Sequence, residues 1–422
     1  MFRILKFLPP LFDFIAFRNF LVLASISIAC LVASAAYAQS TSAADLARAE
    51  KRLVEILGQI ERREINEAFR AVAELTAEVP TFRAAQLLYA DMLRLRTGAA
   101  PMAEQLAQSQ TTPSRRNTGV ADQSIAPPEF LQGLKTELQQ RRQAVLDLPP
   151  AGMIPSNFLQ LSPNVRHAIA VDTSRSRLYV FANSAKGLEL ISNFYVTVGR
   201  NGVHKRAEGD QRTPLGVYFV GRQISRERLP DLYGQGALTV NYPNDWDRLQ
   251  GRTGSGIWLH GVPSDQFARV PQASDGCVVL SNPDIAFLME SVDRRTPVLI
   301  MEKLDWVSPQ WTLQQQQKDA LLPTIEQWTQ AWRQGDMTRL ASMYSPDFAS
   351  ADALDKQRAR LATLGPLSKL EAKDLSLYHW QEAAGEIRIV NLHMDRNSTS
   401  TIRQYWRKHA GQWQIFAEDV LS

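Results

Sequence analysis

The chain has 422 residues, which is too long for one compact core and predicts two or three domains. Its contents of 45% hydrophobic and 21% charged residues are ordinary for a globular protein. A formal charge of only +4 gives no support to a concentrated basic face, so we expect no nucleic-acid partner.

Residues 1–38 have the pattern of an export signal. A net basic start is followed by the apolar stretch "FLVLASISIACLVASAA" over 20–36, and Ala36-Tyr37-Ala38 is a small-x-small cleavage site. The apolar stretch approaches membrane-spanning length, so an uncleaved anchor is the alternative. We expect cleavage after Ala38 and a periplasmic protein.

The exported chain would keep a single cysteine. Cys30 lies in the leader, and Ser27 occupies the place where a lipidation signal needs a branched aliphatic residue. Cys277 then has no partner for an internal disulfide, so the fold must depend on its core. An exported protein with one thiol usually either loses it or uses it.

Residues 42–97 have apolar residues at helical spacing and are predicted to be helical. The second half, on either side of Pro80, resembles one tetratricopeptide-like unit, and one such unit cannot build a solenoid. We expect a helical hairpin for packing or homodimerisation, with docking of another envelope protein as the alternative.

Two connecting segments follow. Residues 98–128 are rich in Gln, Ser, Thr, Pro and Ala, which predicts a flexible linker. Residues 129–166 are predicted to hold one helix, ended by Pro149-Pro150, and a connector.

Residues 167–302 are predicted to form a mostly β domain. Strand-like runs at Ala168–Asp172, Arg177–Phe181 and Leu188–Val198 are separated by turn clusters. A single clear helix interrupts the strands, with Asn282 as its N-cap and Pro283 at its first position.

After a linker over 303–320, residues 321–422 are predicted to be α+β. Helices come first and alternating strands follow, and this order with its Trp and Tyr placements resembles the NTF2-like cone fold. Such cups can hold small ligands or dimerise. Asp336 and Asp347 fit turns and helix caps better than catalysis. The predicted fold is therefore multidomain: N-terminal helices, a mostly β domain and an α+β cone.

Cys277 needs a base if it is to react, because the thiolate is the nucleophile. Of six histidines, His260 stands out: it ends the strand "GIWLH" and is followed by Gly261, which permits close backbone approach. The loop between them contains proline and Gly276 and can bring the two side chains together. On composition alone this is a weak signal, and a buried structural cysteine is the favoured alternative.

Two motifs change this balance. "HG" at 260–261 with "SDGC" at 274–277 resembles the YkuD family of L,D-transpeptidases, and "VGRNGVHKRAEGDQRTPLGVY" at 198–218 resembles a second stretch of the same family. The resemblance covers about 167–302. It implies that Cys277 is the nucleophile, that His260 is the general base, and that the Gly261 carbonyl orients the imidazole.

The resemblance also implies a substrate. The family attacks the bond between meso-diaminopimelate and D-Ala in peptidoglycan tetrapeptide stems, forming a cysteine thioester that an amine resolves. The N-terminal helices and NTF2-like tail resemble a subgroup with cell-shape L,D-carboxypeptidases, so hydrolysis to tripeptides is the alternative. A non-catalytic peptidoglycan-binding module is the second alternative. No cofactor or metal is implied.

Further candidate site residues lie on either side of Cys277. Backbone N–H groups of Gly276 and Cys277 are candidates for the oxyanion hole, with Ser274 in the pocket. Asp275 stands where the family usually has a second histidine, and Val279 stands where a basic or amide residue often follows the cysteine. Asp275 either completes a Cys-His-Asp triad or, as we favour, changes substrate contacts.

The upstream motif offers four polar candidates for substrate contact, although turn and scaffold roles are the more ordinary explanation. These candidates are Lys205, Asp210, Arg212 and Tyr218.

Overall fold

The computed structural model describes residues 43–98, 128–146, 148–319, 321–346, 348, 359, 375–382, 385–393 and 401–421. The predicted export signal, most of the predicted 98–128 linker and Asp347 lie outside them. The chain divides into units 1–46 and 47–422, and every contact discussed below lies within the second. None of the described helices is both long and apolar enough to cross a membrane.

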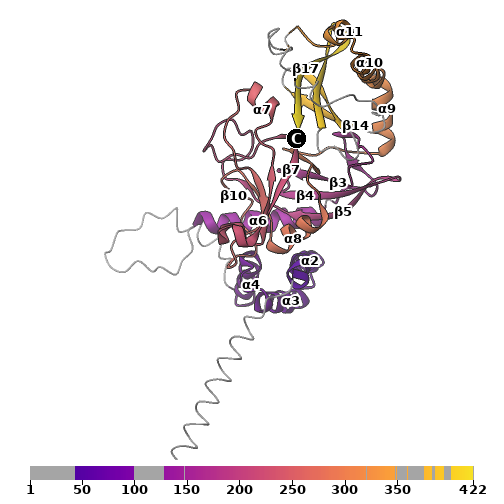
Figure 1. The fold of residues 1–422 in the computed structure, drawn as a ribbon. Helices are drawn as coiled ribbons and strands as arrows, with labels where there is room; N and C mark the ends of the chain where they lie inside the picture. Colours follow the sequence, from indigo (N-terminus) through magenta and orange to yellow (C-terminus); the bar gives the residue numbers. More distant parts are fainter. Residues whose placement is uncertain are drawn as a thin grey trace, which may run out of the picture. The chain divides into compact units, whose positions relative to one another are not determined.

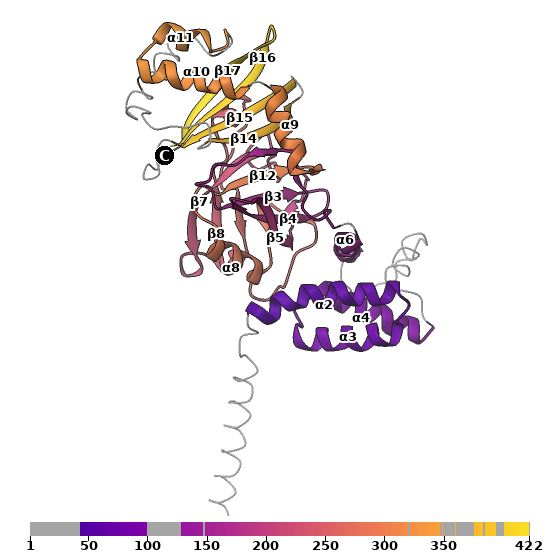
Figure 2. The same cartoon turned by 90° about the vertical axis from the view of Figure 1, so that its right-hand side faces the viewer.

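The N-terminal part is helical, as the sequence predicts. Its helices are α2 (Ala43–Glu61), α3 (Ile65–Glu78), α4 (Arg83–Arg96) and α6 (Pro128–Leu146). Helices α3 and α4 pack against each other across the turn at Pro80 (Figure 2). The apolar residues at helical spacing are the buried ones, with Val72 and Leu75 fully covered in α3. The hairpin is therefore held by its apolar stripe.

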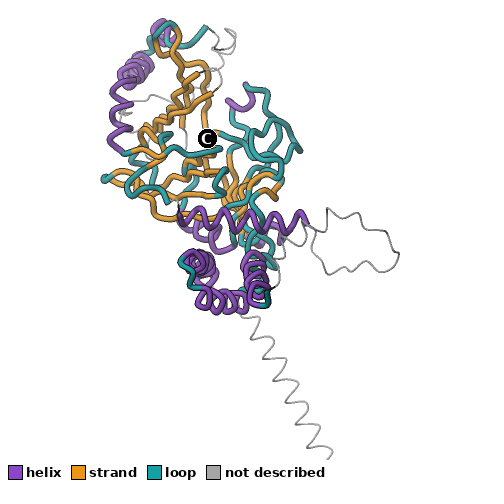
Figure 3. The backbone as a smooth tube through the Cα atoms, turned by 180° about the vertical axis from the view of Figure 1, so that it is seen from behind, coloured by secondary structure: helices purple, strands orange, loops and turns teal. Residues whose placement is uncertain are grey.

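The middle of the chain forms an eight-stranded mixed sheet in the order β11-β9-β8-β7-β12-β3-β4-β5 (Figures 1 and 3). Its strands are β3 (His167–Asp172), β4 (Arg177–Ser184), β5 (Gly187–Tyr195), β7 (Gly216–Ser225), β8 (Gly236–Val240), β9 (Trp258–His260), β11 (Val278–Val279) and β12 (Pro297–Met301). A parallel pair, β6 (Val198–Gly199) and β10 (Gln272–Ser274), lies beside it. The predicted mostly β fold is confirmed.

The helices of this domain are α7 (Asp245–Leu249) and α8 (Asn282–Ser291). Helix α8 is capped by Ser281, whose hydroxyl accepts from Asp284 N–H, and not by Asn282 as the sequence predicts. The side-chain oxygen of Asn282 instead accepts hydrogen bonds from the backbone N–H groups of Gln235 and Val262.

The C-terminal part is α+β, as predicted. Its helices are α9 (Pro309–Asp319), α10 (Leu321–Gln334) and α11 (Met337–Ser342), and its strands are β14 (Leu375–Glu382), β15 (Gly385–His393), β16 (Thr401–His409) and β17 (Gln412–Leu421). Helices α10 and α11 cover one face of the antiparallel sheet (Figure 2). Asp336 caps α11 by accepting from Arg339 N–H, in agreement with its predicted role.

The other face of the C-terminal sheet packs on the middle domain. Strand residues alternate between the two faces. In β15, Val390 and Leu392 meet the helices, whereas Ile387 and Ile389 join a core that includes Phe181 of β4. The middle and C-terminal domains therefore share a hydrophobic core.

The connecting segments are more ordered than their composition indicates. The predicted connector contains β1 (Ile154–Pro155) and β2 (Phe158–Gln160), and β2 is the edge strand of the C-terminal sheet, beside β14. The predicted 303–320 linker contains β13 (Trp306–Val307), which pairs with β1, and helix α9. Trp311 of α9 packs on the C-terminal core, which explains why this segment is folded.

Candidate active site

Two short parallel strands set the backbone at His260 beside the segment that follows Cys277. In the β9–β11 pair, Val278 lies opposite Leu259 and Val279 lies opposite His260. The backbone N–H of Leu280 donates to the His260 carbonyl at 2.8 Å and extends the pairing. Cys277 directly precedes β11, so the alternation of side chains places it on the same face as Val279 and His260.

The imidazole of His260 is buried and fixed. Its Nδ1 lies 2.7 Å from the Gly261 carbonyl oxygen, and the ring of Tyr233 meets it edge-on at 5.0 Å. An Nδ1–H that donates to this carbonyl leaves Nε2 as the proton acceptor. Burial lowers the pKa of His260 to about 4, although the hydrogen bond to Gly261 opposes this. The imidazole is therefore neutral at physiological pH.

Gly261 is required by close contact. A Cβ at this position would collide with the side-chain oxygen of Asn282 and would lie 3.1 Å from the Tyr233 carbonyl. The Gly261 N–H donates to that same Tyr233 carbonyl at 3.1 Å. The carbonyl that faces the imidazole is thus held on both sides, by the Gly261 N–H bond to Tyr233 and by the bond from Val262 N–H to the Asn282 side-chain oxygen at 3.2 Å.

The thiol of Cys277 is free and half-buried. Its S–H points to the Gly256 carbonyl, with 3.4 Å between sulfur and oxygen. Burial raises the pKa of Cys277, and a hydrogen bond from the backbone N–H of Trp258 to the sulfur opposes this rise. The shifts in pKa favour a protonated thiol at Cys277 and a neutral imidazole at His260.

The turn before the thiol is fixed by Ser274. The Ser274 hydroxyl accepts from Gly276 N–H at 3.1 Å and donates to the Cys277 carbonyl at 2.6 Å. Gly276 has φ of +121°, and a Cβ there would lie 2.7 Å from the Arg212 carbonyl oxygen. The Gly276 N–H, one of the two predicted oxyanion donors, therefore has a partner in this structure.

Thr213 connects the upstream motif to this turn. Its fully buried hydroxyl donates to the Gly276 carbonyl at 3.0 Å and accepts from Gly199 N–H at 2.9 Å. The two sequence motifs are thereby joined in one hydrogen-bonded unit.

Asp275 points away from the histidine. Its carboxylate is 74% exposed and forms an ion pair with Arg200 at 2.8 Å. Gln211 donates a further, longer hydrogen bond to it. Because Nδ1 of His260 already faces the Gly261 carbonyl, this structure assembles no Cys-His-Asp triad.

Comparisons with known families agree with this arrangement. Residues 166–300 match the YkuD family, the L,D-transpeptidase catalytic domain, and residues 320–419 match the Cds6 C-terminal NTF2-like domain. Residues 166–300 are a YkuD domain. Both resemblances predicted from the sequence are confirmed.

Several solved structures are similar to this chain. Bd1075 from Bdellovibrio bacteriovorus is 26% identical with a TM-score of 0.47, and the match covers 64% of this chain and 98% of that one. The helical cell shape determining protein Pgp2 from Campylobacter jejuni is 21% identical with a TM-score of 0.48, covering 64% and 96%. An L,D-transpeptidase from Mycobacterium smegmatis is 18% identical with a TM-score of 0.21, covering 32% and 58%. A search of the curated proteins found no match.

The upstream polar residues of the YkuD domain build its scaffold. Lys205 is 4% exposed and its Nζ binds Asp210 at 2.8 Å. Burial would raise the pKa of Asp210, but hydrogen bonds from Lys205 and from three backbone N–H groups lower it to about 2. Arg212 is exposed and donates to the Val203 carbonyl. Tyr218 is fully buried and donates to the Leu215 carbonyl, so it lies out of reach of a bound substrate.

Three residues near the reaction centre were missed by sequence reasoning. Tyr233 contacts the imidazole, and Asn282 supports the backbone around Gly261. Arg269 lies in the loop between His260 and Cys277, and its charge acts on both. A basic residue between base and nucleophile was the available signal for Arg269, whereas the other two contacts depend on the fold.

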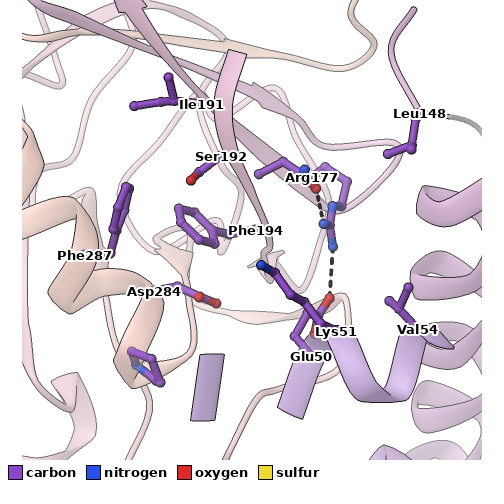
Figure 4. Close-up of a pocket in the computed structure, with 12 residues that line it drawn as sticks. Glu50, Lys51, Val54, Leu148, Arg177, Ile191, Ser192, Phe194, Asp284 and Phe287 are labelled. Atoms are coloured by element: carbon purple, nitrogen blue, oxygen red, sulfur yellow. Dashed lines mark hydrogen bonds and ion pairs between the residues drawn. The ribbon is translucent and has the colours of Figure 1, made fainter. Parts of the chain in front are cut away.

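Two cavities of the chain lie away from this pair. One of about 510 Å³ is lined by residues of α2, β5 and α8 (Figure 4), and one of about 720 Å³ lies near His204 and Trp380. Within the described residues, no cluster of three or more His, Cys, Asp or Glu side chains could hold a metal ion.

Proposed function

We propose that the YkuD domain is a cysteine acyltransferase of the bacterial envelope, an L,D-transpeptidase that acts on peptidoglycan tetrapeptide stems. The observation that supports the proposal is the parallel pairing of β9 with β11, which sets His260, with its Nδ1 facing the Gly261 carbonyl, one strand away from the segment that follows Cys277. Membership of residues 166–300 in the YkuD family supports the substrate class. The predicted leader places the reaction in the periplasm.

The first half-reaction cleaves the bond between meso-diaminopimelate and D-Ala. The Cys277 sulfur attacks the amide carbonyl carbon while its proton passes to Nε2 of His260. The protonated imidazole then gives this proton to the departing nitrogen of D-Ala. The products are free D-Ala and a thioester between Cys277 and the shortened stem.

Proton transfer has to accompany the attack. Burial lowers the pKa of His260 and raises the pKa of Cys277, so an ion pair between them is disfavoured at rest. The Gly261 carbonyl becomes important once the imidazole is charged, because it accepts a hydrogen bond from the imidazolium Nδ1–H.

The negative charge that develops on the carbonyl oxygen needs donors. Cys277 N–H is one candidate, and Gly276 N–H can become the second by exchanging its bond to the Ser274 hydroxyl for one to the oxyanion. Ser274 would then act as a placeholder that satisfies this N–H before substrate binds.

The second half-reaction decides the product. An amine of another stem attacks the thioester and forms a 3-3 cross-link, with His260 accepting the amine proton and returning it to the sulfur. Water in place of the amine gives a tripeptide, which is carboxypeptidase activity.

The test incubates purified protein with tetrapeptide muropeptides and analyses the products by mass spectrometry. Release of D-Ala together with muropeptide dimers supports transpeptidation. Release of D-Ala together with tripeptides shows that the enzyme hydrolyses the thioester, which makes it a carboxypeptidase. Cys277→Ala is the control and should release no D-Ala. If the wild-type protein releases none either, or if Cys277→Ala fully complements a deletion strain, the chain is a binding module and the enzyme proposal fails.

A further inference from the structure

The loop between the base and the nucleophile is held from outside the YkuD domain. Phe267 stacks on Phe82 of the N-terminal hairpin, with ring centroids 4.1 Å apart, and Phe267 N–H donates to the Thr81 carbonyl at 3.3 Å. Further along the loop, Val270 lies so close to Gly133 of α6 that a Cβ there would be 2.9 Å away. The helices therefore contact the segment that leads from His260 to Cys277.

These helices are themselves anchored by buried charges. Arg141 of α6 is 1% exposed, forms a salt bridge with Glu137 at 2.8 Å and pairs with Glu50 of α2. Glu50 also accepts from Arg177 of β4 at 3.1 Å (Figure 4). Breaking one partner of such a buried pair is costly, so the attachment of α2 and α6 to the sheet is firm.

The same anchor reaches the backbone of Arg269. The guanidinium of Arg141 lies 3.9 Å from the ring centre of Tyr195, and the Tyr195 hydroxyl donates to the Arg269 carbonyl at 3.0 Å. The hydroxyl of Thr197 donates to that carbonyl as well, at 2.9 Å. Arg269 is thus held at its main chain from the sheet side, next to the loop residues that the helices contact.

The side chain of Arg269 is a half-buried cation that forms no ion pair within 4.0 Å among the described residues. Asp275, whose negative charge acts on Arg269, is paired with Arg200 at 2.8 Å. Its charge nevertheless acts on both Cys277 and His260. A guanidinium that is partly removed from water and left unpaired beside a reaction centre is suited to an anionic ligand.

We infer that Arg269 binds the terminal carboxylate of the stem peptide, and that the N-terminal helices position it for this task. The inference rests on the proposed function: the departing D-Ala carries a carboxylate one carbon away from the leaving nitrogen. A guanidinium can hold such a carboxylate through two parallel hydrogen bonds. Arg269 would also supply the positive charge that Val279 cannot supply at its position after the cysteine.

The decisive comparison uses two substrates, the tetrapeptide with its free D-Ala carboxylate and the same peptide ending in D-Ala amide. Losing a hydrogen bond to a charged group raises KM by about tenfold or more. We expect Arg269→Gln to raise KM for the acid by at least that factor and to change KM for the amide little. Arg269→Lys should recover part of the loss, because it keeps the charge and loses the two-pronged geometry.

The positioning role is tested by Phe82→Ala against the matched control Phe69→Ala. Phe69 lies in the same hairpin and packs on Tyr89, another residue of the hairpin, with ring centroids 5.5 Å apart. Phe82→Ala should raise KM for the acid several-fold more than KM for the amide. Phe69→Ala should change KM for the two substrates by the same factor. Circular dichroism of each variant checks that the fold is intact.

The outcomes separate the inference from the proposed function. If wild-type protein releases D-Ala from both peptides and Arg269→Gln slows both equally, Arg269 is merely structural and the inference is overturned. If Phe82→Ala and Phe69→Ala behave alike, the positioning role is overturned. If wild-type protein releases nothing from either peptide, the proposed function fails and the inference falls with it.

Discussion

Replacing His260 with glutamine should remove a specific sensitivity to acid. Burial lowers the pKa of His260 from 6.5 to about 4 in the folded chain. Between these two values the unfolded chain binds a proton at this histidine that the folded chain does not, so the free energy of unfolding falls as pH falls. Above pH 6.5 the residue is neutral in both states and contributes no pH dependence.

The size of the effect follows from the shift. The pKa of His260 differs by about 2.5 between the unfolded and the folded chain, and each pKa unit corresponds to 1.36 kcal/mol. The free energy of unfolding should therefore fall by an amount on the order of 3 kcal/mol between pH 7 and pH 4. Glutamine has no titratable proton and its amide can still donate to the Gly261 carbonyl. The difference in unfolding free energy between wild type and His260→Gln should therefore change by about this amount across the range.

The assay is urea unfolding of both proteins at pH 7, 5.5 and 4, followed by tryptophan fluorescence. Every other titrating group is common to the two proteins and cancels in the difference. A difference that stays constant with pH would show that His260 has an ordinary pKa, and the account of a buried neutral base would be wrong.

The remaining predictions concern the turn around the thiol. Asp275→Asn should leave the rate of D-Ala release within a few-fold of wild type, because Asp275 is exposed and paired with Arg200; a loss of several hundred-fold in the same assay would restore the triad. Gly276→Ala should abolish D-Ala release while the circular dichroism spectrum is retained, since the added Cβ meets the Arg212 carbonyl at a φ of +121°; full activity would contradict the close contact. Alkylation of Cys277 by iodoacetamide should stay slow at pH 7 and rise only above the usual thiol pKa, because burial raises the pKa of the thiol; fast alkylation at pH 6 would indicate a resting thiolate.

Local signals made much of this fold predictable. The strands β3 and β4 follow from their apolar runs and turn residues, and the start of α8 was predicted to within one residue from Asn282-Pro283. The return of the chain from His260 to the Cys277 segment was predictable because the loop after the strand that ends in His-Gly contains proline and glycine, and β11 does pair with β9. These features depend on neighbours in sequence.

Other features depend on partners far along the chain. Strand β2 has three residues, too few for a period-two pattern, and it becomes a strand by pairing with β14. The Gln-rich segment before Leu321 has weak amphipathicity, and α9 folds because Trp311 finds the C-terminal core. Tyr233 reaches the imidazole through the arrangement of the sheet, which no local pattern encodes.

The pairing of β2 with β14 has a consequence for synthesis. Strand β2 leaves the ribosome before any part of the YkuD domain, whereas its neighbour β14 is made more than two hundred residues later. Until then Leu159, which is buried in the C-terminal core of the finished molecule, has no such core to join, whereas Phe158 can already pack on Phe181 of β4. The two neighbouring strands of the C-terminal sheet thus lie on opposite sides of the YkuD domain in the sequence. A chain that stops before β14 leaves β2 without the strand it pairs with.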